Sequence, residues 1–232
     1  MNPKPTPGLF ITGTGTGVGK TYVACLIAES MVRAGLRVGV YKPVASGCRF
    51  VEGATRSDDA LALWKAAGEP GALPDVCPQA FLASLAPHLA ARAENKAVDP
   101  KLLIAGARLW EGRCDVLLVE GAGGLMSPVT DDLYVADLAA ELRYPLVVVS
   151  PNVLGTINAT LQTLITAATF REGLDVAGVV LNDISDTDGD ASAASNRREL
   201  ELSCVPPVLA HVAWQQRGFE PALDWAAVAG GV

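Results

Sequence analysis

The sequence predicts an α/β fold with a doubly wound, mostly parallel β-sheet flanked by helices on both faces. Apolar runs alternate with helix-like segments along almost the whole chain, as crossover connections between parallel strands require. Several runs are continuously apolar, which is typical of strands covered on both faces. With 232 residues, 50% of them hydrophobic, the chain can bury one sizeable core, so we expect a single domain over residues 1–232.

A strand, a glycine-rich turn and a helix are expected first. The apolar run Leu9–Ile11 predicts a short buried strand, and apolar residues at helical spacing predict a helix from Lys20 to Arg33. The dipeptide Ala34-Gly35 ends that helix. The next strand is then expected at Arg37–Tyr41.

The middle of the chain adds two helices and two strands. Helices are expected at 58–67 and 100–111, and the second has Pro100 at its start, where proline is favoured. Continuously apolar strands are expected at 115–119 and 145–149. The segment 68–99 is rich in proline and alanine, and its pattern assigns no element.

The last third continues the alternation with a helix at 155–170 and strands at 176–181 and 205–212, the final one interrupted by Pro206-Pro207. The acidic stretch 183–190 invites comparison with a calcium loop. That comparison fails because Ile184 and Ser195 would occupy positions that require carboxylates. We therefore expect a solvated loop there.

Composition and charge exclude several classes of function. The 18 basic and 25 acidic side chains give a net charge of −7, which argues against electrostatic binding to nucleic acid or to anionic membranes. No apolar run approaches the ~20 residues that span a bilayer. The first residues lack the apolar core of a signal peptide, and the five scattered cysteines fit reduced thiols. We expect a cytoplasmic protein.

The sharpest motif lies between the first strand and the first helix and reads Gly13-Thr14-Gly15-Thr16-Gly17-Val18-Gly19-Lys20-Thr21. Its glycines allow backbone N–H groups to turn inward, and the helix N-terminus favours anions. Lys20 suits β- and γ-phosphates, and the hydroxyl of Thr21 suits Mg²⁺. Five residues separate Gly13 from Gly19 where the usual phosphate loop has four. A dinucleotide fingerprint fails in both frames, because Val18 and Lys20 replace its third glycine.

Two further motifs follow predicted strands and therefore reach the same edge of the sheet. Glu120 ends an apolar strand and precedes Gly121-Ala122-Gly123-Gly124, a run that lets the backbone approach a ligand closely. A carboxylate beside a phosphate loop is where nucleotide enzymes hold a metal. Lys42 ends the second strand, within Tyr41-Lys42-Pro43-Val44-Ala45-Ser46-Gly47. The spacing alone leaves Lys42 open between surface charge and a role in binding substrate or phosphoryl oxygens.

Together these motifs, with Ser57-Asp58-Asp59-Ala60-Leu61, resemble those of the dethiobiotin synthases, in family order from Gly13 to about Asn182. Weaker matches occur at Ala86-Pro87-His88 and at 154–158. The resemblance implies a P-loop NTPase-like fold and a role in biotin biosynthesis. The implied reaction carboxylates 7,8-diaminononanoate with CO₂ and closes its ring at the expense of ATP, giving dethiobiotin, ADP and phosphate through a carbamate and a carbamic–phosphoric anhydride, with Mg²⁺.

The resemblance also implies site residues. Catalytic roles fall to Lys20, Lys42, Thr16 and Ser46. ATP binding falls to Gly15, Thr16, Gly17, Val18, Gly19, Lys20, Thr21 and Glu120, with Asn182 at the adenine edge. Mg²⁺ would be held by Thr21, Asp59 and Glu120. Substrate binding falls to Thr16, Lys42, Ser46 and Gly123, and to Leu154, Gly155, Thr156 and Asn158, which in the family come from the second subunit of a homodimer.

Two departures from the family pattern bear on these assignments. Gly17 stands where some members have Glu, so only its backbone can contribute. The Asp58-Asp59 doublet makes the metal ligand ambiguous by one residue, and Asp59 is favoured because Ala60-Leu61 follow it as in the family.

Two other classes of function compete with this interpretation, besides a non-catalytic nucleotide-binding module. A nucleotide-switch ATPase of the partitioning type would carry a lysine five residues before Lys20, where this chain has Gly15. An amidotransferase-like synthase of the cobyrinate group would need a glutamine-hydrolysing domain with a Cys–His pair. We expect His88 to be structural, because the proposed reaction requires no imidazole.

Overall fold

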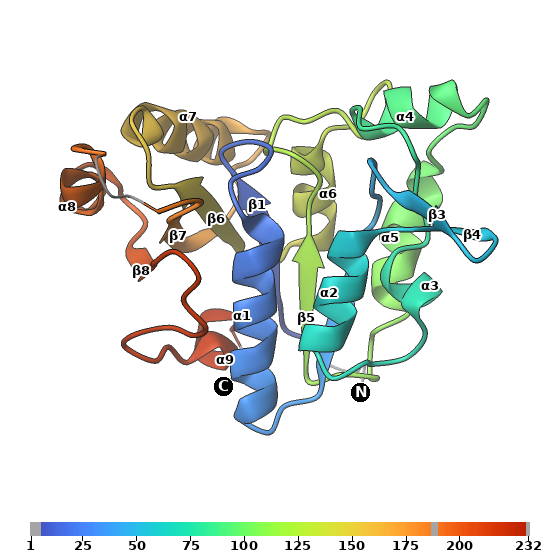
Figure 1. Cartoon of the computed structure of the whole chain (residues 1–232), viewed down its shortest axis with the longest axis horizontal. Helices are drawn as coiled ribbons and strands as arrows, with labels where there is room; N and C mark the ends of the chain where they lie inside the picture. Colours follow the sequence, from blue (N-terminus) through green and yellow to red (C-terminus); the bar gives the residue numbers. More distant parts are fainter. Residues whose placement is uncertain (1–5, 187–189, 231–232) are drawn as a thin grey trace.

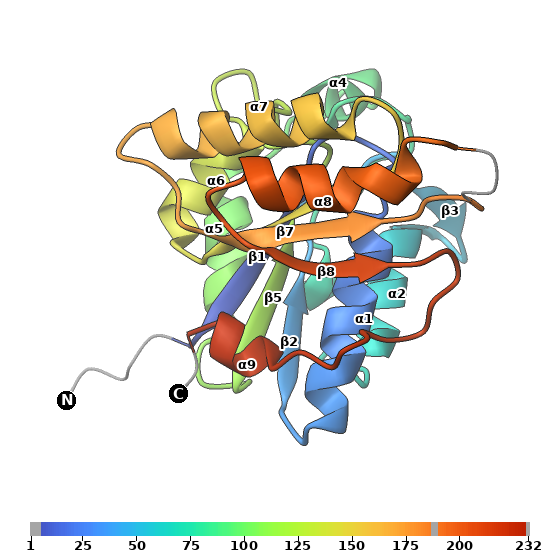
Figure 2. The same ribbon diagram turned by 90° about the vertical axis from the view of Figure 1, so that its left-hand side faces the viewer.

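The structure is a computed structural model that describes residues 6–186 and 190–230, and it confirms the predicted fold class. Its main sheet has six strands in the order β2-β5-β1-β6-β7-β8, and every pairing between neighbours is parallel (Figures 1 and 2). The strands are β1 (Gly8–Gly13), β2 (Val38–Tyr41), β5 (Val116–Glu120), β6 (Leu146–Pro151), β7 (Val176–Asn182) and β8 (Val208–Val212).

Helices cover both faces of the sheet. The helices α1, α2 and α9 lie on one face, and α5, α6, α7 and α8 lie on the other (Figures 1 and 2). Their bounds are α1 (Lys20–Arg33), α2 (Asp58–Ala66), α5 (Pro100–Arg108), α6 (Val135–Leu142), α7 (Thr156–Thr169), α8 (Ala193–Ser203) and α9 (Trp225–Val228). In the described part of the chain, no helix is both long and apolar enough to cross a membrane.

The continuously apolar strands form the core, as predicted. Every residue of β1, β2 and β5 is buried, because helices close both faces. Capping sets the helix starts: the Asp99 carboxylate accepts hydrogen bonds from the backbone N–H groups of Lys101 and Leu102, and Pro100 opens α5.

Three expectations need correction. The last strand begins at Val208, after the two prolines, because proline cannot donate a ladder hydrogen bond. The helix expected at 100–111 ends at Arg108. Asp183 is buried and not solvated: it accepts a 2.8 Å hydrogen bond from the Asn152 amide and lies 2.8 Å from the His211 ring nitrogen. Residues 187–189 of the acidic stretch lie outside the described residues.

The segment without an assigned pattern contains two short helices, α3 (Leu73–Val76) and α4 (Pro87–Ala93). Before it, a small antiparallel hairpin pairs β3 (Arg49–Val51) with β4 (Ala54–Arg56). Backbone hydrogen bonds join Ala45 to this segment: the Ala45 N–H donates to the Gln79 carbonyl, and the Phe81 N–H donates to the Ala45 carbonyl, each at 2.9 Å. These contacts hold the segment beside the end of β2.

One close contact fixes the end of β2. The Tyr41 hydroxyl donates toward the carbonyls of Leu102 and Leu103, at 3.0 Å each, and a Cβ on Gly106 would lie 2.2 Å from its oxygen. We predict that Gly106→Ala lowers the free energy of unfolding by about 2 kcal/mol, because the overlap outweighs the gain in helix propensity. Urea denaturation measures this change.

Gly218→Ala is the matched control, since a Cβ there meets no atom within 4 Å and the backbone is not left-handed. It should shift stability by no more than about 0.5 kcal/mol. Equal stability of the two variants would show that the contact with Tyr41 is not restrictive.

Candidate active site

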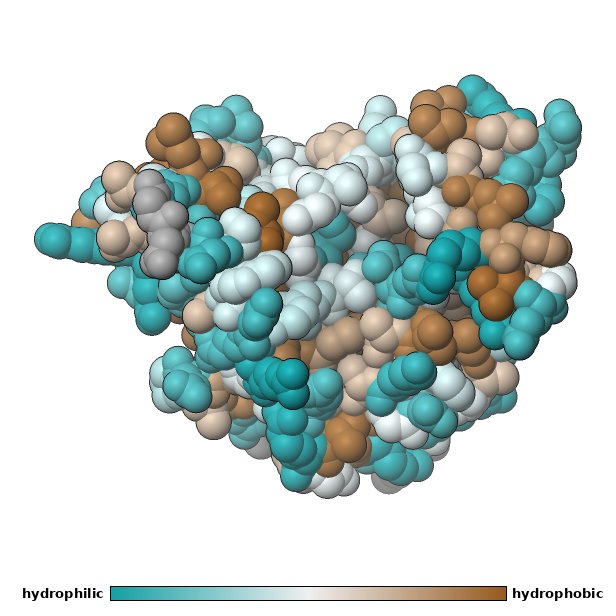
Figure 3. Space-filling model, in the orientation of Figure 1, coloured by the Kyte–Doolittle hydropathy of each residue, from teal (hydrophilic) through white to brown (hydrophobic). Residues whose placement is uncertain are grey.

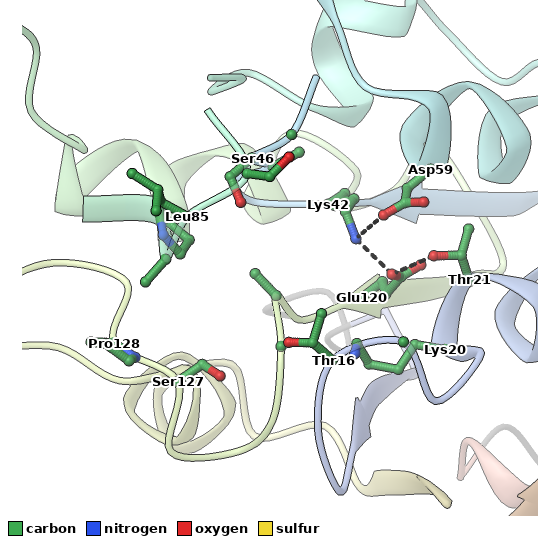
Figure 4. A pocket seen from close by; sticks show the side chains of 18 of the residues that line it. Thr16, Lys20, Thr21, Lys42, Ser46, Asp59, Leu85, Glu120, Ser127 and Pro128 are labelled. Atoms are coloured by element: carbon green, nitrogen blue, oxygen red, sulfur yellow. Dashed lines mark hydrogen bonds and ion pairs between the residues drawn. The ribbon is translucent and has the colours of Figure 1, made fainter. Parts of the chain in front are cut away.

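The predicted motifs meet at the carboxyl edge of three neighbouring strands. The loop 14–19 follows β1, Lys42 follows β2 and Glu120 ends β5, and these strands are adjacent in the order β2-β5-β1. Together with α2 and the segment 84–87 they surround a cavity of about 750 Å³ (Figure 4). Ligands of parallel α/β sheets bind at this edge.

The phosphate loop is held by contacts with its own chain. The Thr14 N–H donates to the Val149 carbonyl at 3.0 Å, and the Lys20 ammonium donates to the Gly15 carbonyl at 2.9 Å. Gly19 has φ +89°, and a Cβ there would lie 2.1 Å from the amide nitrogen of Asn182. That position therefore requires glycine.

Lys42 contacts two carboxylates and, through one of them, is linked to the Thr21 hydroxyl. Its ammonium lies 2.6 Å from Glu120 Oε1 and 3.2 Å from Asp59 Oδ2 (Figure 4). The Thr21 hydroxyl donates to the same Glu120 oxygen at 2.8 Å. The lysine and glutamate side chains are almost fully buried, at 4% and 2% exposed. The three predicted metal ligands are thus brought together around one lysine.

The two lysines of the cavity respond differently to burial. Burial would lower the pKa of Lys42, but the charges of Glu120 and Asp59 outweigh it and raise the pKa above the ordinary value. For Lys20, burial dominates and lowers the pKa, with a further contribution from the charge of Lys42 that Glu120 opposes. The difference follows from position, because Lys42 contacts both carboxylates whereas Lys20 contacts a backbone carbonyl.

The site fits a hard divalent cation. The available donors are all oxygens, as Mg²⁺ prefers, and Glu120 Oε2 is buried without a hydrogen-bond partner. Among residues 6–186 and 190–230, no group of three or more His, Cys, Asp or Glu side chains could hold a metal. A cation here would therefore need the Thr21 hydroxyl and ligands brought by a nucleotide.

The two aspartates of the doublet lie in different surroundings. Asp59 contacts Lys42, whereas Asp58 pairs with Arg49 at the exposed surface. The N–H of Ala60 binds the Ser57 hydroxyl at 3.2 Å, which starts α2 so that Asp59 lies in its first turn, on the cavity side.

The cavity collects most of the predicted residues. Its lining includes Thr16, Gly17, Gly19, Lys20, Thr21, Lys42, Ser46, Asp59, Glu120 and Gly123. Gly15, Val18 and Asn182 do not line it. Asn182 is 2% exposed, and its amide donates to the Val18 carbonyl at 3.1 Å, so it contacts the phosphate loop from behind. Its role at the adenine edge stays a prediction.

The predicted substrate segment 154–158 does not line the cavity of its own chain. Leu154 is 85% exposed, while Thr156 is buried with its hydroxyl 2.7 Å from that of Ser150. The Thr156 side chain is therefore used inside its own subunit. The parts of this segment that are exposed at the surface are Leu154, Asn158 and the N-terminus of α7.

One wall of the cavity was not predicted from the sequence. It is formed by Ser84, Leu85, Ala86, Pro87, Ser127 and Pro128. The weak Ala86-Pro87-His88 match pointed to part of it. Figure 3 shows apolar surface over α4 and the β3–β4 hairpin, where Leu89 and Phe50 are exposed. The two buried lysines thus share the cavity with a wall that is apolar except for Ser84 and Ser127.

Comparison with known proteins identifies the family. The AAA domain family AAA_26 matches residues 7–219. The chain is 42% identical over 214 residues to an ATP-dependent dethiobiotin synthetase of Rhodopirellula baltica, covering 88% of this chain and 82% of that protein. The chain belongs to the dethiobiotin synthetase family. A family member from Anaeromyxobacter dehalogenans is also 42% identical, over 208 residues and 90% of each chain.

Dethiobiotin synthetases share their fold with other nucleotide-binding proteins. A ParA family ATPase from Chlorobium tepidum superposes with a TM-score of 0.55, covering 90% of this chain and 84% of that one, at 16% sequence identity. At this identity the likeness shows the fold alone and lends no support to a partitioning function.

The contact between Asn182 and the loop generates a prediction about nucleotide binding. Asn182→Ala should weaken binding of ATP and of inorganic tripolyphosphate by a similar factor, about tenfold, because it leaves the buried Val18 carbonyl unpartnered and loosens the loop. Isothermal titration calorimetry with both ligands measures the two affinities. A loss confined to ATP would instead identify Asn182 as a residue that reads the base.

Proposed function

We propose that this chain forms dethiobiotin, ADP and phosphate from 7,8-diaminononanoate, CO₂ and ATP. The observation that carries the proposal is the convergence of Lys20 and Lys42 with Glu120 in one cavity, between a phosphate loop and an apolar wall. A phosphate tail and an amine-bearing carbon chain need these two kinds of surface side by side. Membership of the dethiobiotin synthetase family supports the same reaction.

The chemistry creates anions at every stage. One amine nitrogen attacks CO₂ and loses a proton, giving a carbamate. A carbamate oxygen attacks the γ-phosphorus, and the bond to ADP breaks with its electron pair leaving on ADP. The second amine attacks the carbamoyl carbon and expels phosphate, losing a proton as the ring closes. Lys20, Lys42 and the loop N–H groups stabilise the developing negative charge.

Thr21, Asp59 and Glu120 are the proposed ligands of Mg²⁺, which when bound would neutralise charge on the phosphate oxygens. Thr16 and Ser46 line the cavity near the lysines and offer hydroxyls to the diamine or carbamate. The apolar wall, including Leu85 and Pro87, suits the methylene chain of the substrate. Its distal carboxylate requires a further partner.

That partner is proposed to be a second copy of the chain. The segment 154–158 lies outside the cavity of its own subunit and exposes Leu154 and Asn158 at the N-terminus of a 14-residue helix, which favours anions. A homodimer would let this segment bind the substrate carboxylate in the neighbouring site. The five free cysteines agree with a reducing compartment, which supports a cytoplasmic location.

The overall reaction is tested with labelled bicarbonate. Incubation with ATP, Mg²⁺ and the diamine should yield labelled dethiobiotin and one phosphate per product, and omission of the diamine should abolish phosphate release. Mass spectrometry identifies the product. Steady phosphate release without the diamine would favour a nucleotide-switch ATPase.

The aspartate doublet offers a matched pair of variants. Asp59→Asn should raise the Mg²⁺ concentration needed for half-maximal activity by about tenfold or more, because a ligand is lost. Asp58→Asn should leave that concentration unchanged, since Asp58 pairs with Arg49 at the surface. A shift in the Asp58 variant alone would reverse the assignment.

Subunit complementation tests the shared site. Lys20→Ala and Asn158→Asp dimers should each be nearly inactive, the second because an added carboxylate repels the substrate. After subunit exchange, hybrids carry one intact site, so activity should return to about a quarter of wild type. Exchange without recovery, with hybrids verified by native mass spectrometry, would place segment 154–158 outside the partner's site.

A further inference from the structure

All three proposed metal ligands are engaged by, or through, one lysine. The Lys42 ammonium contacts Glu120 Oε1 at 2.6 Å and Asp59 Oδ2 at 3.2 Å. The Thr21 hydroxyl points to that same Glu120 oxygen, at 2.8 Å. In Figure 4 the lysine nitrogen lies between the two carboxylates. The space between Asp59 and Glu120, the two carboxylates that would hold a cation, is therefore filled by an ammonium group of the chain itself.

The charges of the cavity are also balanced. Lys20 and Lys42 supply two positive charges, and Asp59 and Glu120 supply two negative ones, all four lining the same cavity. A bare divalent cation would add two positive charges to a balanced site, and these would repel the ammonium groups of Lys20 and Lys42. A cation that arrives with a triphosphate brings compensating negative charge.

The coordination chemistry of magnesium also disfavours binding of a bare cation while Lys42 keeps its contacts. Magnesium demands near-octahedral geometry with oxygens at about 2.0–2.1 Å and usually binds through one or two carboxylates plus substrate phosphates. Glu120 Oε1 already accepts from the Lys42 ammonium at 2.6 Å and from the Thr21 hydroxyl at 2.8 Å, which together use both of its lone pairs. A cation that binds this oxygen must therefore displace a donor, whereas Glu120 Oε2 is buried and unpartnered.

We propose that the Lys42 ammonium occupies the metal position in the free enzyme. When a metal–nucleotide complex binds, the ammonium moves away from Asp59 and Glu120 and toward the substrate. The proposal rests on the metal ligands assigned under the proposed function. Once released, the Lys42 ammonium remains in the cavity, whose lining also contains Thr16 and Ser46. Binding of the metal and movement of the Lys42 ammonium toward the carbamate are therefore coupled.

Binding of Mn²⁺ alone, without nucleotide, tests the proposal directly. Electron paramagnetic resonance measures free Mn²⁺ in titrations of wild type, Lys42→Met and Lys20→Met. Lys42→Met should bind Mn²⁺ at least tenfold more tightly than wild type. Lys20→Met is the matched control, because it removes the same charge from the cavity without freeing either carboxylate, and it should tighten binding by less than a third of the factor seen for Lys42→Met. Equal tightening in the two variants would show an effect of net charge alone and overturns the proposal. Equal affinity of wild type and Lys42→Met overturns the proposal.

Lys42→Met leaves Glu120 buried without its ion pair, so thermal unfolding is measured with and without Mn²⁺. Mn²⁺ should raise the melting temperature of the variant more than that of wild type, and an equal rise overturns the proposal.

A crystal structure of the wild-type protein with Mn²⁺ and a non-hydrolysable ATP analogue is independent of any variant. The lysine nitrogen should lie more than 4 Å from both carboxylates, with an anomalous Mn²⁺ signal beside them. Mn²⁺ beside both carboxylates with the Lys42 contacts retained would overturn this proposal alone. Mn²⁺ bound elsewhere would overturn the metal ligands on which it rests, while the labelled-bicarbonate experiment still judges the reaction separately.

Discussion

The buried ion pair between Lys42 and Glu120 is the interaction around which this site is organised. It depends on the pairing of β2 with β5, in which Tyr41 lies opposite Val119, so that the next residue of each strand meets at the sheet edge. Breaking such a pair by removing one partner typically costs about 3–5 kcal/mol, because the other charge stays buried. The register of β2 on β5 therefore places the ion pair, and the ion pair in turn holds the charged groups of the site in position.

The strands and the phosphate loop could be predicted because their signals are local. Leu9–Ile11 and 115–119 are continuously apolar, and the glycines before Lys20 allow a left-handed backbone that other residues avoid. The segment 68–99 could not be predicted, because it is held by contacts such as that of Ala45 with Gln79, between residues distant in sequence. The hairpin at 49–56 pairs residues near in sequence, but its strands of 3 residues each are too short to show a periodic pattern.

The residues of the site also divide into those predicted by local motifs and those placed by tertiary contacts. Lys20, Thr21 and Glu120 follow from motif and strand position, and the structure brings them together. Asp59 is favoured over Asp58 by the Ala60-Leu61 that follow it, whereas the ion pair of Asp58 with Arg49 depends on the β3–β4 hairpin, which no motif predicts. Ser84 and Ser127 belong to loops without a motif, so their place in the cavity is a consequence of tertiary packing.

The contact between Gly19 and Asn182 links two positions that are far apart in the chain. A side chain at residue 19 would overlap the Asn182 amide, and that amide in turn binds the Val18 carbonyl. A larger side chain at residue 182 would thus displace the backbone of the loop at Val18 and Gly19. The shape of the phosphate loop therefore depends on a residue 164 positions away from Val18 in the sequence, and variation at either position constrains the other.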